Sequence, residues 1–375
     1  MTHRLDKLQP VLAVMLAALG VMTVFSAHAD WVRQIVWLIL GGVLYVAAAF
    51  YDFRRLRTIA PALYAGMLLM LVAVPLVGHT ALGARRWLAV AGFPLEPSEL
   101  SKLIVVIALA AYLSRWERIS WRVFMGALGL VAAPAALVLV QPDLGTTIVL
   151  LAVTAGMLFL SGARPAQLMS IVASGVVALP LLPHLLHGYQ KQRLEIFLDP
   201  NKDPLGAGYN LLQARIAVGS GGVFGRGWLL GLQGQLGFVP ERATDFVFAS
   251  FAEEFGLVGC LVLLTLFGTL LIRLLRSAAV APDRFGELLA GGVFCILFVQ
   301  VVENVGMNTG LLPIAGIPLP LISYGGSATI TTLTALGLVQ SVMLRRRSVA
   351  YQDRTSPSGA FRPPHAPGVG SLRGW

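Results

Sequence analysis

Charged residues are scarce in this chain of 375 residues, where Asp, Glu, Lys and Arg together make up 12%. A soluble globular domain carries roughly twice that share, so the chain lacks the material for a water-facing surface. Its residues are 57% hydrophobic and its mean hydropathy is +0.77. These values exclude an ordinary soluble enzyme and indicate a protein that crosses a membrane many times.

Cysteine is nearly absent as well, with two residues in the whole chain. Cys260 and Cys295 lie in apolar runs without the spacing of metal ligands, which favours packing roles and argues against a disulfide framework. The alternating pattern of a membrane β-barrel is also missing. No internal repeat stands out, which weakens an inverted-repeat transporter without excluding it.

What the chain has in abundance is long apolar runs. About ten of them are long enough to cross a bilayer as helices, namely residues 8–26, 32–50, 59–77, 98–113, 123–139, 147–161, 166–186, 246–272, 285–303 and 326–344. The predicted fold is therefore all-α, a polytopic membrane protein with a single transmembrane domain over residues 1–344. Residues 345–375 are rich in Pro, Gly, Ser and Arg and predict a disordered tail.

The net charge of +10 indicates a topology rather than a nucleic-acid partner, because most basic residues gather in alternate gaps between the spans. The positive-inside rule places these gaps, and with them both termini, in the cytoplasm. Residues 187–244 then form one large extracytoplasmic loop, of a length that usually carries function. The basic gaps contain Arg4, Lys7, Arg54, Arg55, Arg57, Arg115, Arg118, Arg122, Arg164, Arg273, Arg276, Arg284 and the arginines of the tail.

The stretch FVPERATDFVFASFAEEFG, residues 238–256, brings carboxylates to the outer end of a predicted span. If the helix starts near Thr244, Asp245 lies in its first turn, where the helix dipole favours an acid. Asp245, Ala249, Ala252 and Gly256 also share one helix face, a small-residue seam that another helix can approach closely. Asp245 is therefore either a capping acid or an accessible, partly desolvated general base.

Two more acids of this stretch lie deeper. Glu253 and Glu254 are about 12–14 Å further along the helix at a rise of 1.5 Å per residue. Acids at such a depth have a structural partner or handle protons or substrate, and the first interpretation is favoured. Upstream in the loop, Tyr209 to Val218 (YNLLQARIAV) is amphipathic and predicts a helix that rests on the membrane surface.

Polar groups elsewhere could form a second site at the outer interface. The run PSELSK at 97–102 places Glu99 and Lys102 at i, i+3, which suits an ion pair, with Ser98 as helix cap. The functional alternative is a cationic site made by Lys102 and Arg86. Asp143, in QPDLGT, is expected chiefly to cap the next helix.

The segment NVGMNTGLLPIAGIPLPLISYGGS at 304–327 is apolar but full of helix breakers. Non-helical backbone near membrane depth survives where it is buried in protein or lines a wet cavity. This segment is therefore expected to form a wall of the site.

Together these segments resemble the SEDS family of bacterial membrane glycosyltransferases. The matching runs are ARRWLAVAGFPLEPSELSKL at 84–103, QPDLGTT at 141–147, a long run at 203–259 and NVGMNTGLLPIAGIPLPLISYGGSA at 304–328. The resemblance covers about residues 8–344 in order. The Gly-Trp and Gln-rich run at 227–235 is similar to the branch that serves cell elongation rather than division.

The resemblance implies a peptidoglycan glycosyltransferase that polymerises lipid II at the outer face of the cytoplasmic (inner) membrane. It places the essential carboxylate at Thr-Asp-Phe, here Asp245, as general base, with polyprenyl pyrophosphate as leaving group. It implies no certain cofactor, and the use of a divalent cation (Mg or Mn) stays open. The expected substrate-binding residues are Arg86, Lys102, Arg193, Arg215, Glu99, Asp143 and Ser323.

The expected partners are lipid II, a class B penicillin-binding protein (a transpeptidase) and other membrane proteins of the elongation complex, with no nucleic acid. Two alternatives stay open from the residues. A lipid II flippase or other transporter is supported by the intramembrane acids Glu253, Glu254 and Glu303. A non-catalytic scaffold of the elongation complex would tolerate changes of its polar loop residues.

Overall fold

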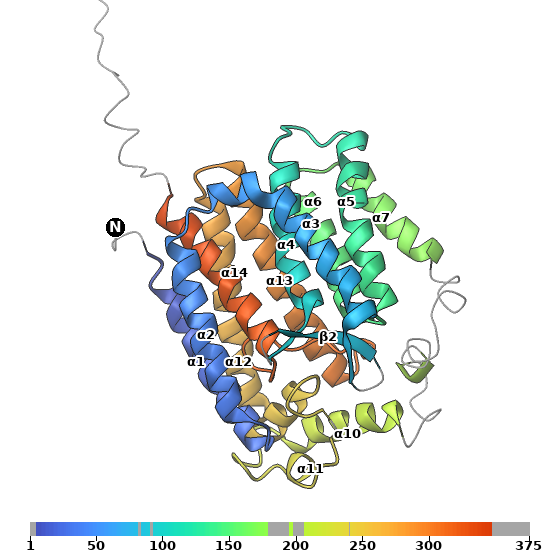
Figure 1. Cartoon of the computed structure of the whole chain (residues 1–375). Helices are drawn as coiled ribbons and strands as arrows, with labels where there is room; N and C mark the ends of the chain where they lie inside the picture. The colour runs from blue at the N-terminus through green and yellow to red at the C-terminus, as the bar shows by residue number, and fades with distance from the viewer. Residues whose placement is uncertain are drawn as a thin grey trace, which may run out of the picture.

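The computed structural model describes residues 5–81, 84–90, 93–178, 195–197, 206–239 and 241–346. Within this part of the chain, long helices run roughly alongside one another (Figure 1). Seven of the described helices are long and apolar enough to cross a membrane. They are α1 (Leu8–Ser26), α2 (Trp31–Phe50), α3 (Arg54–Val77), α5 (Trp121–Val140), α12 (Val247–Ala279), α13 (Arg284–Thr309) and α14 (Gly326–Leu344).

Three shorter helices complete the bundle: α4 (Pro97–Leu113), α6 (Leu144–Leu160) and α7 (Pro165–Ala178). The all-α, polytopic membrane fold predicted from the apolar runs is thereby confirmed, and the predicted span 166–186 ends outside the described residues. α4 and α13 lie at the centre, since α4 is buried along most of its length and α13 packs against α4, α6, α12 and α14.

A small antiparallel sheet interrupts the helical pattern, and the sequence analysis predicts no strand here. It has the order β1-β2-β3 and consists of β1 (His79–Ala81), β2 (Ala84–Val90) and β3 (Phe93–Leu95). Consecutive strands are separated by two residues ending in Gly83 or Gly92, a spacing and residue type that favour tight hairpins. The sheet leads into α4 and places Arg86 beside the start of that helix.

The described part of the large loop contains α10 (Ala207–Ser220) and α11 (Leu232–Gln235), at the lower end of the bundle in Figure 1. The amphipathic stretch predicted at 209–218 forms the helix α10. Leu211, Ala214 and Ala217 are completely buried, and α10 packs against α12 and α13. Ile216 is exposed, so part of the apolar face packs inside the protein and contact of the rest with the membrane surface stays a prediction.

α12 is broken at Gly256, whose backbone has φ 65° and ψ −165°. Residues 222–227 fill the break by backbone hydrogen bonds. The N–H groups of Arg226 and Gly227 donate to the carbonyls of Glu253 and Glu254, both at 3.0 Å. In return, the N–H groups of residues 257 and 258 donate to carbonyls 222 and 223. A helix interruption in an apolar span is tolerated because these groups are satisfied within the protein.

Candidate active site

Asp245 lies just before α12 and not in its first turn, so the predicted helix start is wrong. The helix begins at Val247, with Phe246 at the N-cap position and no side-chain capping bond. Thr244 does not cap the helix and donates its hydroxyl to Glu241 Oε2 at 2.9 Å. Asp245 is partly exposed.

The backbone ahead of Asp245 is held by the non-helical segment that precedes α14. Tyr324 donates its backbone N–H to the carbonyl of Ala243 at 2.7 Å. Ser323 donates its hydroxyl to the carbonyl of Thr244 at 2.7 Å and accepts a bond from the N–H of Leu319. The predicted substrate-binding residue Ser323 is thus a buried group that positions the chain beside Asp245.

The carbonyl of Asp245 itself is held by two asparagines of α13. Asn304 and Asn308 donate their Nδ2 groups to it at 3.0 Å and 3.1 Å, and both side chains are completely buried. Asn308 also accepts the N–H of Ala249 at 3.1 Å, which satisfies a donor in the first turn of α12. We call the four groups that hold carbonyls 243–245 the carbonyl clamp: Asn304, Asn308, Ser323 and the N–H of Tyr324.

Asn304 and Asn308 are site residues that the sequence patterns did not predict. The available signal was their i, i+4 spacing on an otherwise apolar helix, because buried amides need hydrogen-bond partners and so mark a polar contact between elements.

The predicted small-residue seam is buried as expected, since Ala249, Ala252 and Gly256 are all inaccessible to solvent. A helix approaches it, as predicted, because Ala249 packs in one hydrophobic cluster with Leu211, Ala214 and Ala217 of α10. A Cβ added to Gly221, at the end of α10, would collide with the backbone carbonyl of Ala252. The seam therefore receives α10 and the start of the glycine-rich loop that follows it.

Glu253 and Glu254 both have partners inside the protein, as the structural interpretation predicts. The carboxylate of Glu253 accepts the N–H groups of Gln233 at 2.8 Å and Gly234 at 3.0 Å, and so caps the start of α11. Glu254 accepts the hydroxyl of Ser26 at the end of α1. These two acids fasten the large loop and α1 to α12.

A second group of polar residues surrounds the start of α4. Lys102 Nζ lies 2.7 Å from Glu99 Oε1, and the two side chains are 2% and 6% exposed. This confirms the predicted pair. The helix itself starts with Pro97, and Ser98 does not cap it but donates to the carboxylate of Glu96 at 3.3 Å; proline is favoured at a first helical position because its missing N–H is not needed there.

Arg86 of β2 lies against the turn that precedes α6. Its guanidinium donates to the carbonyls of Gln141 and Pro142 and lies 3.9 Å from Asp143. Asp143 caps α6 by accepting the N–H of Thr146 at 3.1 Å, as predicted. Arg86 and Asp143 thus join the sheet, α5 and α6 at one point.

Two further carboxylates, those of Glu303 and Glu96, lie near Lys102 and Asp143. Glu303 of α13 is buried, interacts electrostatically with Lys102 and Asp143, and its Oε2 accepts no hydrogen bond from the described residues. Glu96 interacts with the same groups and with Glu99. We call these six residues the α4 charge cluster: Arg86, Glu96, Glu99, Lys102, Asp143 and Glu303. The two cations of the functional alternative, Arg86 and Lys102, therefore lie in one cluster with four acidic side chains.

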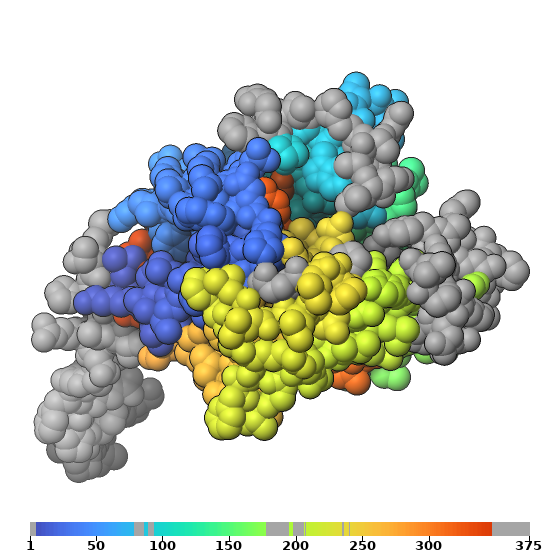
Figure 2. Space-filling model, turned by 90° about the horizontal axis from the view of Figure 1, so that it is seen from below, coloured from blue at the N-terminus to red at the C-terminus, as the bar shows by residue number. Residues whose placement is uncertain are grey.

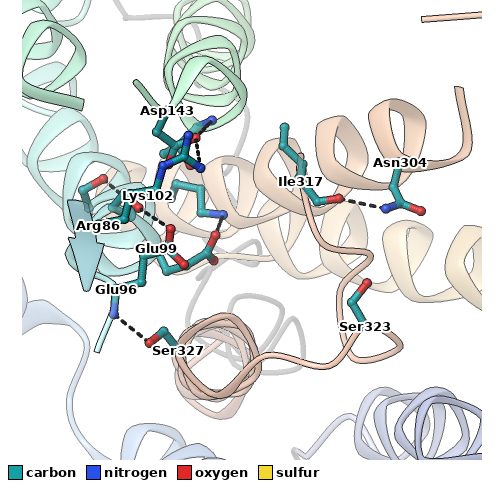
Figure 3. A network of polar contacts seen from close by, with 12 residues as sticks. Arg86, Glu96, Glu99, Lys102, Asp143, Asn304, Ile317, Ser323 and Ser327 are labelled. Carbon is teal, nitrogen blue, oxygen red and sulfur yellow. Dashed lines mark hydrogen bonds and ion pairs between the residues drawn. The ribbon is translucent and has the colours of Figure 1, made fainter. Parts of the chain in front are cut away.

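The segment 310–327 joins the α4 charge cluster to the carbonyl clamp (Figure 3). Ser327, in the first turn of α14, accepts the N–H of Glu96 at 2.9 Å, and Ser323, four residues earlier, holds the carbonyl of Thr244. Asn304 also donates to the carbonyl of Ile317 at 2.8 Å. This arrangement agrees with the prediction that the segment forms a wall of the site.

Figure 2, which shows the molecule from below, has a hollow between the N-terminal helices, the region around α4 and the start of α12. Parts of the C-terminal third of the chain, in orange and red, are visible at its floor. Within the described ranges, no group of three or more His, Cys, Asp or Glu side chains is arranged to hold a metal ion. The structure therefore gives no ligand set for a divalent cation.

Arg215 and Arg193 are the two remaining cations predicted to bind substrate. Arg215 of α10 donates its Nη2 to the carbonyl of Gly310 at 3.0 Å, where α13 ends in a left-handed glycine. It therefore ties α10 to α13 and keeps part of its guanidinium for other contacts. Arg193 lies outside the described residues.

The pKa of Glu96 is raised to about 8, first by burial and then by the neighbouring carboxylates of Asp143 and Glu99, against the opposing charges of Arg86 and Lys102. Between about pH 4.5 and pH 8 the folded protein then holds a proton that the unfolded chain has lost. Stability should therefore fall as the pH rises through this window. We expect Glu96→Gln to flatten this fall in the unfolding temperature measured in detergent.

The exposed acid Glu117 provides a matched control for that experiment. Glu117→Gln should keep the pH dependence of the wild type. Equal slopes in the wild type and Glu96→Gln would refute the assignment.

Replacing Lys102 by Met should destabilise the protein by about 3–5 kcal/mol, because Glu99 would be left buried without its partner. Activity should fall further than in Lys102→Arg. The double variant Lys102→Met, Glu99→Gln removes both charges and should recover the unfolding temperature. If Lys102 also contacts substrate, this double variant regains stability but not activity; recovery of both would leave Lys102 a purely structural role.

The comparisons with known proteins agree with this geometry. The family model FtsW/RodA/SpoVE, described as "Cell cycle protein", matches residues 7–348. The chain is 42% identical over 352 residues to the peptidoglycan glycosyltransferase MrdB of Escherichia coli K12, covering 92% of this chain and 95% of that protein.

Two solved structures share the fold. A chain in a structure on the structural coordination of polymerization and crosslinking by a peptidoglycan synthase complex has a TM-score of 0.81 and 35% identity, over 91% of this chain and 98% of that one. The rod shape determining protein RodA of Thermus thermophilus has a TM-score of 0.70 and 32% identity, over 92% and 98%. The chain belongs to the FtsW/RodA/SpoVE family, the SEDS glycosyltransferases.

Proposed function

We propose that this peptidoglycan glycosyltransferase polymerises lipid II into glycan strands at the outer face of the cytoplasmic membrane during cell elongation. The similarity to MrdB and RodA supports the reaction class and the link to cell shape. The carbonyl clamp is the observation that carries the mechanism, because it fixes the backbone of one partly exposed carboxylate, Asp245, from two other parts of the chain.

In the proposed reaction, Asp245 accepts the proton of the acceptor's 4-hydroxyl as that oxygen attacks the anomeric carbon of the donor sugar. The new glycosidic bond forms while the bond from the anomeric carbon to the pyrophosphate oxygen breaks, and polyprenyl pyrophosphate leaves. A positioned general base contributes about 10²–10⁴ in rate. Orientation of the two sugars must supply much of the rest.

The departing pyrophosphate needs cationic stabilisation. Lys102 and Arg86 are already close to Glu99 and Asp143, which lowers the positive potential that they offer. We therefore assign the pyrophosphate chiefly to Arg215 and to Arg193, the latter on sequence alone. The α4 charge cluster is better suited to sugar hydroxyl and amide groups, since carboxylates accept their hydrogen bonds.

Different observations support the position of the site and its partner. The distribution of basic residues between the spans supports an extracytoplasmic position for the end of the bundle that carries Asp245. A similar chain belongs to a peptidoglycan synthase complex that coordinates polymerization and crosslinking. We propose a class B penicillin-binding protein as the crosslinking partner of this chain, together with other elongation-complex membrane proteins.

The test of the function is glycan synthesis from lipid II by the purified protein in detergent, alone and with a partner transpeptidase. The proposal predicts glycan strands that depend on the chain. A flippase would instead move lipid II across vesicles without making polymer. A scaffold would do neither, so lipid II that stays unpolymerised in both settings would reject the proposal.

A further inference from the structure

The break in α12 fixes how deep the glycine-rich loop, residues 221–238, lies relative to the membrane. In an unbroken helix, the N–H groups of Leu257 and Val258 would donate to the carbonyls of Glu253 and Glu254. Here both pairs are separated and each group is bonded to residues 222–227 instead. That part of the loop therefore lies inside the break, at the height of residues 253–258 of the helix.

This height falls within the apolar part of the span. Residues 257–272 contain no charged side chain, and the first charge beyond them is Arg273. These 16 residues cover about 24 Å at a rise of 1.5 Å per residue, less than the roughly 30 Å of a bilayer's hydrocarbon core. With Arg273 taken as the inner boundary, the core extends past Leu257 toward Glu253, which brings the inserted loop to its edge.

The side chains of the loop are those of a lipid-facing surface. Between Gly221 and Phe238 the sequence has a single charged residue, Arg226. Phe224 is 83% exposed, and Val223, Leu230 and Leu236 are exposed as well. On α12, beside the inserted backbone, the apolar residues Leu257, Val258, Leu261 and Val262 are also exposed, so the two surfaces are continuous.

An aromatic cluster marks the other end of the loop. The indole N–H of Trp228 donates to the carbonyl of Met22, and its ring lies 5.8 Å from that of Phe25. Phe25 in turn contacts the ring of Trp31, at the start of α2. Aromatic side chains at the ends of spanning helices are typical of the interface between lipid and water.

We propose that residues 221–238 are a re-entrant segment that inserts its apolar side chains into the outer leaflet of the membrane. The occupant of this surface is lipid, because the exposed side chains continue the apolar surface of α12 and end in an aromatic belt. The proposal does not depend on the reaction assigned to Asp245. It rests on α12 crossing the membrane and on the backbone bonds at its break.

Spin-label accessibility in liposomes tests this insertion. The two buried cysteines are first replaced (Cys260→Ala, Cys295→Ala), and a nitroxide is attached at Phe224→Cys or, separately, at Leu236→Cys. Collision with oxygen, which concentrates in lipid, should exceed collision with a water-soluble nickel chelate, as it should at Leu261→Cys on α12. The ratio of the two should be several-fold higher than at the exposed Arg33→Cys, and the unfolding temperature shows that each variant is folded.

Two results would overturn the proposal. In the first, labels at both loop positions collide with the nickel chelate as readily as the label at Arg33→Cys. The loop would then lie in water, as expected for a surface that binds a soluble partner domain. Labels shielded from both reagents would show that another part of the chain or a second copy covers the segment.

Discussion

The variant Asp245→Asn is expected to bind lipid II and to polymerise it about 10²–10⁴ times more slowly than the wild type. The amide has nearly the same shape as the carboxylate but cannot accept the proton of the attacking hydroxyl. The loss should fall on turnover rather than on folding, because Asn304 and Asn308 hold the backbone carbonyl of residue 245, which the substitution leaves in place.

Glu241→Gln is the matched control for this prediction. Glu241 is an exposed acid four positions earlier that accepts the hydroxyl of Thr244, and a glutamine oxygen can accept the same bond. Polymer yield in this variant should stay close to that of the wild type. Glycan strands formed at the wild-type rate by Asp245→Asn would remove Asp245 from the chemistry.

The second large effect is expected for Asn308→Ala. The change removes one of two side-chain donors to the carbonyl of Asp245 and one of two acceptors for the N–H of Ala249, and each lost hydrogen bond costs about 0.5–1.5 kcal/mol in stability. A displaced general base can lose about 10² in rate for a shift of 1 Å. We therefore expect kcat to fall about 10- to 100-fold, with little change in KM.

The neighbouring residue Thr309 separates this effect from a general weakening of α13. Its hydroxyl donates within its own helix, to the carbonyls of Val305 and Gly306, so Thr309→Ala should keep kcat. Asn308→Asp retains the acceptor for Ala249 but places a buried carboxylate against the carbonyls of Asp245 and Asn304, so it should lower kcat and stability at least as much as Asn308→Ala. A fall in stability without any change in kcat would contradict a positioning role.

The parts of the fold that the sequence predicts correctly depend on local pattern. Long apolar runs set the positions of the spans, since each helix satisfies its own backbone in the membrane. Two contacts of the candidate site are local as well: Lys102 reaches Glu99 one turn away, and Asp143 reaches the N–H of Thr146 three residues later. Such contacts can be inferred from spacing alone.

The parts of the fold that the sequence does not predict depend on contacts of backbone groups that are far apart in the sequence. Gly256 reads as one more small residue of a seam, yet its positive φ opens the helix to residues some 30 positions earlier. The start of α12 is misplaced for a similar reason, because the carbonyl of Asp245 bonds to side chains of α13. Backbone carbonyls are the same at every position, so these contacts have no sequence pattern of their own.

The central claim is that Asp245 serves the chemical step and that its surroundings hold it in place. Measuring the Kd for lipid II and the single-turnover rate of glycan bond formation on the same sample of Asp245→Asn tests this most directly. The account predicts a Kd close to that of the wild type and almost no product. Product at the wild-type rate, or a loss of binding large enough to explain the missing product, would contradict it.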